Sequence, residues 1–241
     1  MKKIITIFFL FLSVITHIAA QEFPLPFPEV KEERTADTSK GVSGKNFIYL
    51  YMGLGMIVGK SEGMGSDILY GHSTNFAMGL RFFHHFNKFY RMGVDLGHDG
   101  YSYRLKQDST KILPNNQLHN RERIVINNLN VTFVNRLTIG KATKGMGTFI
   151  DVGGFAGWTH TSINFTQNDH IIANAANATK TQTYHRGLVF VEDYQYGITA
   201  GFGRNFFRIV AKYRLSDNFK SQFIYSELPR ITVGLELGLH P

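Results

Sequence analysis

Residues 231–240 read ITVGLELGLH, and this stretch decides the fold of the chain. Its odd-numbered positions carry Ile, Val and Leu, whereas its even-numbered positions carry Thr, Gly, Glu and His. Because successive side chains of a β-strand point to opposite faces, the alternation predicts a strand with one apolar face and one polar face. When only alternate residues meet lipid, a near-zero mean hydropathy is expected, and the chain has −0.13.

The same alternation recurs along the chain, in stretches that match the length of about 9–11 residues with which a tilted strand crosses a bilayer. In the fourth stretch the alternation changes parity before Asn128, which a β-bulge at that point would explain. We therefore expect an all-β fold, an eight-stranded antiparallel up-and-down transmembrane β-barrel over residues 46–241. The predicted strands cover residues 47–58, 75–86, 90–101, 124–139, 148–159, 191–203, 206–215 and 231–240.

The connections between the predicted strands alternate in length. Outer-membrane barrels place short turns in the periplasm and long loops outside the cell, and an even number of strands puts both termini on one side. The sequence therefore predicts a location in the bacterial outer membrane with both termini in the periplasm. Short turns are expected at residues 87–88, 141–145 and 204–205, and long loops at residues 59–73, 106–120, 160–187 and 216–227.

The N-terminal residues are typical of an export signal followed by a tail. Lys2 and Lys3 precede an apolar run that ends in two alanines, so residues 1–20 are predicted to be a signal peptide. Residues 21–45 are rich in proline and charge, which favours an extended periplasmic tail. That tail is either a spacer or a docking peptide for a periplasmic or envelope protein, with three interleaved apolar anchors. These anchors are Phe23, Leu25 and Phe27.

The composition narrows the chemistry. The chain contains no cysteine, which excludes disulfides and thiolate metal sites. Its net charge of +8 favours acidic neighbours, and for an exported protein these are the headgroups of outer-membrane lipid and lipopolysaccharide rather than nucleic acid. The sequence has no phosphate loop, zinc spacing or nucleotide fingerprint, so no cofactor is expected.

Ionisable residues fall on the inner-facing positions of the predicted strands. An eight-stranded barrel has an interior just wide enough for side chains to fill, and charges there must be paired because their isolation is costly. We expect a salt-bridge network that fills the lumen, while the excess of basic groups leaves a narrow anion-biased pore as an alternative. The expected lumen residues are Arg81, Arg91, Asp95, Arg136, Asp151, Arg208, Lys212, Arg214 and Glu236.

The loop 160–187 holds the residue types of a hydrolase, so a lipid A-modifying enzyme is another alternative. Loop histidines are more often solvated polar residues, and nothing in the sequence fixes their geometry, so we expect no enzymatic activity. His84 and His85 are successive strand residues that point to opposite faces, which argues against a shared metal ion. The catalytic candidates are Ser162, His160, His170 and His185, with Asp169 and Glu192.

Aromatic residues are expected in two belts, one at each membrane interface. The belt near the short turns would hold Phe86, Phe89, Tyr90, Phe206 and Phe207. The belt near the long loops would hold Tyr101, Tyr103, Trp158, Phe219, Phe223 and Tyr225.

With an export signal, eight predicted strands and the motif ELPRITVGL at residues 227–235, the chain resembles a known family. It is similar to the small outer-membrane β-barrel proteins of Bacteroidota, often labelled porin-like, with the architecture of OmpA- and OmpX-type barrels. The resemblance covers residues 47–241 and implies insertion by the barrel-assembly machinery, but no catalytic residues. Such barrels often end in an aromatic residue, whereas this sequence ends in Leu239-His240-Pro241.

These observations together predict a non-enzymatic outer-membrane protein with a filled lumen and a structural or cell-surface interaction role. Some members of this broad group are accessory subunits of secretion or gliding machines. The alternative is therefore an accessory subunit of an outer-membrane secretion or assembly machine, contacted through residues 21–45.

Overall fold

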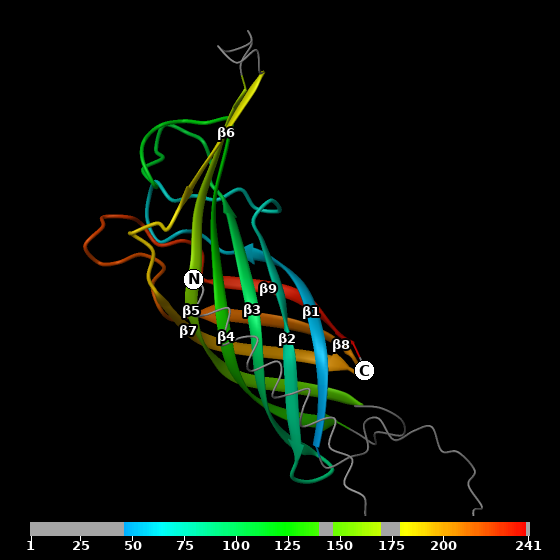
Figure 1. Cartoon of the computed structure of the whole chain (residues 1–241). Coiled ribbons are helices and arrows are strands. Elements are labelled where there is room, and N and C mark those ends of the chain that lie inside the picture. The colour runs from blue at the N-terminus through cyan, green and yellow to red at the C-terminus, as the bar shows by residue number, and fades with distance from the viewer. Residues whose placement is uncertain (1–45, 140–146, 170–178, 240–241) are drawn as a thin grey trace, which may run out of the picture. The chain divides into compact units, whose positions relative to one another are not determined.

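The chain is all-β in the part that the structure describes. The structure is a computed structural model and describes residues 46–139, 147–169 and 179–239. The signal peptide, the tail 21–45, the turn 141–145 and residues 240–241 of the sequence predictions lie outside these ranges. The strands in the described ranges (Figure 1) are β1 Asn46–Val58, β2 Thr74–His85, β3 Tyr90–Arg104, β4 Arg121–Ile139, β5 Thr148–Asp169, β6 Lys180–Arg186, β7 Tyr194–Arg204, β8 Phe207–Arg214 and β9 Ile231–Leu239.

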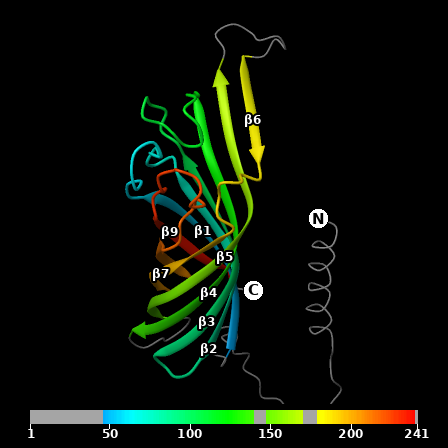
Figure 2. The same cartoon turned by 90° about the vertical axis from the view of Figure 1, so that its left-hand side faces the viewer.

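The strands pair antiparallel in one sheet that closes into a ring. The sheet order is β4-β3-β2-β1-β9-β8-β7-β5-β6, and an additional pairing between β4 and β5 closes a ring of eight strands. The ninth strand, β6, pairs with β5 and extends beyond the ring as one arm of a hairpin, as Figure 2 shows. The all-β class, the antiparallel pairing and the closure by eight strands are thus confirmed. No helix in the described ranges combines the length and the hydropathy that a membrane span requires.

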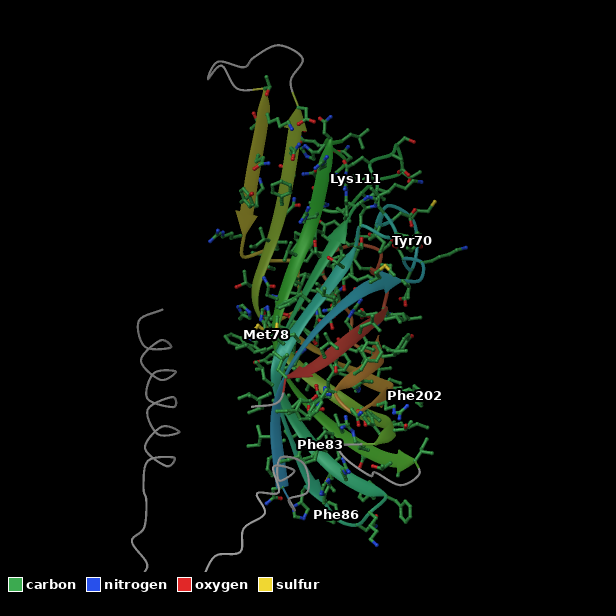
Figure 3. The ribbon with its side chains drawn as sticks, turned by 90° about the vertical axis from the view of Figure 1, so that its right-hand side faces the viewer. Tyr70, Met78, Phe83, Phe86, Lys111 and Phe202 are labelled. Atoms are coloured by element: carbon green, nitrogen blue, oxygen red, sulfur yellow. The ribbon has the colours of Figure 1, made fainter. Side chains whose placement is uncertain are left out.

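Side chains alternate between the two faces of the ring along each strand. In β9, Leu235 is 49% exposed whereas the neighbouring Glu236 is only 3% exposed. Met78 and Phe202 likewise point away from the ring, while Phe83 is fully buried within it (Figure 3). Because a strand repeats every two residues and the ring is closed, one parity of every strand shares the interior.

The interior is layered between its two ends, which Figure 3 marks with Phe86 at the short-turn end and Lys111 at the opposite end. Near the short turns, the rings of Phe47 and Phe83 stack with centroids 5.4 Å apart. The middle is polar and charged. At the long-loop end, inward residues become apolar and form a cap. The cap consists of Ile57, Ile68, Tyr101, Tyr103, Leu105, Leu113, Ile124, Ile126, Phe190, Val191, Phe219 and Leu228.

The cap corrects the expected aromatic belt at the long loops. Tyr101, Tyr103 and Phe219 are buried in the cap rather than placed on the outer face, and Phe223 and Tyr225 are partly buried against it. Trp158, by contrast, is exposed on the outside as expected. The difference arises because the long connections fold over the open end of the ring, so that its inner face is covered there by apolar side chains instead of water.

The structure also corrects the loop 160–187. β5 continues through it as far as Asp169, and β6 pairs with this extension, so a hairpin occupies the described part of the segment. Residues 170–178 lie outside the described ranges. The expected sixth strand begins at Tyr194 instead of Val191, because Val191 belongs to the cap and bridges to Phe219.

The expected bulge lies in the partner strand. In β4 the alternation of burial is unbroken, with Ile124 and Ile126 facing inward under the cap. The register with β5 shifts between Asn127 and Asn128, but the extra residue is His160 of β5. The sequence of β4 changes parity only because its inward residues become apolar at this end.

Candidate functional site

All nine ionisable residues predicted to face the interior are buried. Their exposed fraction runs from 0% for Arg136 and Asp151 to 9% for Lys212. They come from β2, β3, β4, β5, β8 and β9, each at a position where its strand presents the inner parity. Most of them meet in one network.

Six of these residues form a line of alternating charges across the interior, which we name the charge chain. Its strongest links are three pairs: Arg136 Nε lies 2.7 Å from Asp151 Oδ1, Arg208 Nη1 lies 2.7 Å from Glu236 Oε2, and Arg81 Nη2 lies 2.7 Å from Asp95 Oδ2. In order of contact the charge chain runs Arg136, Asp151, Arg208, Glu236, Arg81 and Asp95.

Two further contacts join the three pairs. Asp151 Oδ2 lies 3.0 Å from Arg208 Nε, an ionic contact without hydrogen-bond alignment. Glu236 Oε2 accepts a hydrogen bond from Arg81 Nη2 at 3.1 Å. The Tyr49 hydroxyl of β1 also accepts hydrogen bonds from two guanidinium groups, those of Arg81 at 3.2 Å and Arg136 at 3.4 Å.

The alternation of positive and negative charges offsets the desolvation cost of burying them. A single buried charge without a partner costs several kcal/mol in desolvation, and burial strengthens the attraction between opposite charges that touch. Asp151, Arg208, Glu236 and Arg81 each contact two groups of opposite sign. Three arginines and three carboxylates thus balance to zero, so the charge chain is a structural brace rather than a positive lining.

A second tier of ion pairs lies toward the long-loop end. Lys212 Nζ lies 2.7 Å from Asp99 Oδ2, and Lys111 Nζ lies 2.8 Å from Glu122 Oε2. Asp99 also accepts a hydrogen bond from Asn130. All five side chains are buried, so the excess of basic groups predicted from the sequence is largely neutralised.

Three of these residues were missed by sequence reasoning. Asp99 was detectable, because it has the same parity in β3 as Arg91 and Asp95. Glu122 precedes the expected start of its strand, so no alternation marked it. Lys111 belongs to a long connection, where the sequence carries no periodic signal for the direction of a side chain.

Charged groups also fasten the long connections to one another. Arg214 Nη1 lies 3.2 Å from Glu227 Oε2, and Glu227 accepts hydrogen bonds from the backbone N–H groups of Asn218 and Phe219. Outside the ring, Arg230 pairs with Glu62, and its hydrogen bonds hold the pKa of the Glu62 carboxyl below the ordinary value.

Side chains fill the interior of the ring. The cap covers the long-loop end, and the aromatic residues around Phe47, Phe83 and Phe206 occupy the short-turn end. A small pocket beside Lys212 and Glu236 has a volume of about 10 Å³, which is space for roughly one water molecule. This packing argues against a wide path for solutes.

The most exposed strand of the structure is β6. All seven of its residues are exposed. One edge of β6 pairs with β5, and in the described part of the chain no strand pairs with the other edge. An unpaired edge presents a row of backbone N–H and C=O groups, to which a partner strand can add. Sequence reasoning missed β6 because its polar residues lack apolar alternation.

The hydrolase candidates do not assemble in the described residues. Ser162 is buried, and its hydroxyl accepts a hydrogen bond from the backbone N–H of Leu188 at 2.9 Å. His160 is exposed and contacts His98 and Thr161 instead. His185 is exposed on β6. No described hydrogen bond links Ser162 to a histidine, and His170 lies outside the described ranges.

The described residues do not form a metal site. His84 bonds to Asn46 at 2.6 Å whereas His85 contacts the ring of Phe47, so these successive histidines diverge. Among the described residues, no group of three or more His, Cys, Asp or Glu side chains could hold a metal ion.

Comparisons of the chain with protein-family models, curated proteins and solved structures found no match.

Asp151→Asn tests the charge chain. The substitution leaves Arg136 and Arg208 without their shared carboxylate, so we expect the free energy of unfolding to fall by about 3–5 kcal/mol. Urea titration of the protein folded in detergent micelles measures it. Asp193→Asn, which removes an exposed carboxylate, is the control and should change stability little. Equal stability of the two variants would show that the charge chain is not a brace.

Proposed function

We propose that the chain is an integral protein of the bacterial outer membrane, whose eight-stranded ring crosses the bilayer as a sealed β-barrel. The observation that carries this proposal is the outer face of the ring, where strand after strand presents exposed Leu, Ile, Val, Met and Phe side chains. So continuous an apolar surface is rare on a water-soluble protein. A closed ring also pairs the backbone N–H and C=O groups between its strands, as hydrocarbon requires.

The sides of the membrane follow from the lengths of the connections. The short turns would face the periplasm, and the long connections and the β5–β6 hairpin would face the outside of the cell. The predicted signal peptide supports export, and the family resemblance supports insertion by the barrel-assembly machinery. Outer-membrane lipid and lipopolysaccharide are then the immediate neighbours of the protein.

The role that we propose is non-enzymatic: mechanical support of the envelope or interaction at the cell surface. The filled interior argues against transport, and the charge chain argues for rigidity. The hairpin supports an interaction role, since β6 raises a fully exposed strand beyond the ring. Lys180 and Arg186 make this strand basic, which suits a partner with an acidic surface.

Site-specific labelling tests the membrane topology, because the chain has no cysteine of its own. We expect Thr183→Cys in β6 to react with a membrane-impermeant maleimide on intact cells. Lys88→Cys, in the exposed turn between β2 and β3, should react only after the outer membrane has been permeabilised. Labelling of both sites on intact cells, or of neither before permeabilisation, would contradict the proposed topology.

Electrical recording tests the sealed interior. Purified protein added to planar lipid bilayers should produce no stepwise conductance, because the cap and the aromatic residues at the short-turn end leave no continuous water path. Detergent alone is the control for leaks. Uniform steps that scale with the amount of protein would instead favour the narrow anion-biased pore.

A further inference from the structure

Among the described residues, every buried cation except one has a carboxylate partner. Six cations each have a carboxylate within 3.2 Å. The carboxylates are Asp95, Asp99, Glu122, Asp151 and Glu236, with the nearly buried Glu227 as the sixth. Arg91 is the seventh buried cation, and no carboxylate of the described residues pairs with it.

Arg91 stands near one end of the interior. It is the second residue of β3, directly after the turn that joins β2 to β3. Its cross-strand neighbours are His85 on β2 and Arg136 on β4. Arg136 is committed to Asp151, so Arg91 faces a like charge rather than a counterion.

The guanidinium of Arg91 is oriented but not satisfied. It is only 5% exposed, and its carbon atom Cζ lies 5.6 Å from the centroid of the Phe47 ring. Its Nε and Nη1 are buried without a hydrogen-bond partner in the described part of the chain. A buried guanidinium with two unused donors is costly, and each of these N–H groups can donate a charge-assisted hydrogen bond to a carboxylate or phosphate oxygen.

A second unsatisfied group lies beside Arg91. Thr138 of β4 follows Arg136 by two residues on the same inner face, which makes it the diagonal neighbour of Arg91 across the strand pair. The Thr138 hydroxyl oxygen is buried and also lacks a hydrogen-bond partner among the described residues. A backbone hydrogen bond of 2.7 Å from Thr138 N to Phe89 O ties this position to the turn before Arg91.

We infer that the short-turn end of the ring carries an oxyanion-binding site, with Arg91 as its central cation and the Thr138 hydroxyl as a further donor. The ligand is a carboxylate or a phosphate group. The source is a soluble oxyanion. The ligand would neutralise Arg91, the buried cation that has no carboxylate partner among the described residues.

Thermal unfolding of the full chain in non-ionic detergent tests this site. Inorganic phosphate replaces chloride in the buffer at constant ionic strength. We expect phosphate to raise the unfolding midpoint saturably. Arg91→Met should abolish the effect and, without phosphate, unfold at the same or a higher temperature, because an unpaired buried charge has been removed. Lys88→Gln removes an exposed cation from the same end and should respond as the natural chain does.

A further variant tests the second donor of the site. Thr138→Val should weaken phosphate binding by about tenfold, as expected for one lost hydrogen bond to a charged ligand. The inference is overturned if the natural chain does not respond, if Arg91→Met keeps the response, or if Arg91→Met loses stability or fails to fold without phosphate.

Discussion

The charge chain is the interaction on which the rest of the structure depends. Its six members come from β4, β5, β8, β9, β2 and β3, and the hydroxyl of Tyr49 adds β1. One network therefore ties seven of the eight strands of the ring together from within. Each contact is demanding in geometry, because a buried charge that loses its partner pays the full cost of desolvation. The network thus fixes the register of the strands as well as their closure.

The backbone makes room for these large side chains through glycine. A Cβ atom at Gly53 of β1 would lie 2.8 Å from Cγ of Glu236, and one at Gly201 of β7 would collide with the guanidinium of Arg208. A larger residue at either position would have to displace the long charged side chain that a neighbouring strand sends across it. β7 contributes no charge to the charge chain, but its Gly201 leaves space for the guanidinium of Arg208.

The sequence predicted the middle of the ring well and its ends poorly, for a physical reason. In the middle, polar inner positions alternate with apolar outer ones, so the parity of Asp151 or Glu236 was readable directly. Near the long connections, inner positions such as Ile124 and Tyr103 become apolar, and polarity no longer tells inside from outside. In β6 both faces are exposed, so no alternation is needed and none was seen.

The partners within the interior were beyond the reach of the sequence. Arg81 and Glu236 are 155 residues apart and meet only because β1 pairs with both β2 and β9. The isolation of Arg91 is likewise a property of the assembled ring, since the buried carboxylates of the described residues are all paired with other cations. Sequence reasoning supplied the set of charges, and the fold assigned the pairs.

The central claim is that odd and even positions of one strand meet lipid and a packed polar interior in turn. Spin labels measure this alternation directly. A label is attached through a cysteine introduced at each of residues 129–134 of β4 in turn, and the protein is reconstituted into lipid vesicles. Oxygen collision rates should be high at Leu129, Val131 and Phe133 and low at Asn130, Thr132 and Val134. Collision rates that do not alternate with a period of two would contradict the account. High accessibility of Leu129, Val131 and Phe133 to a water-soluble nickel complex would also contradict it.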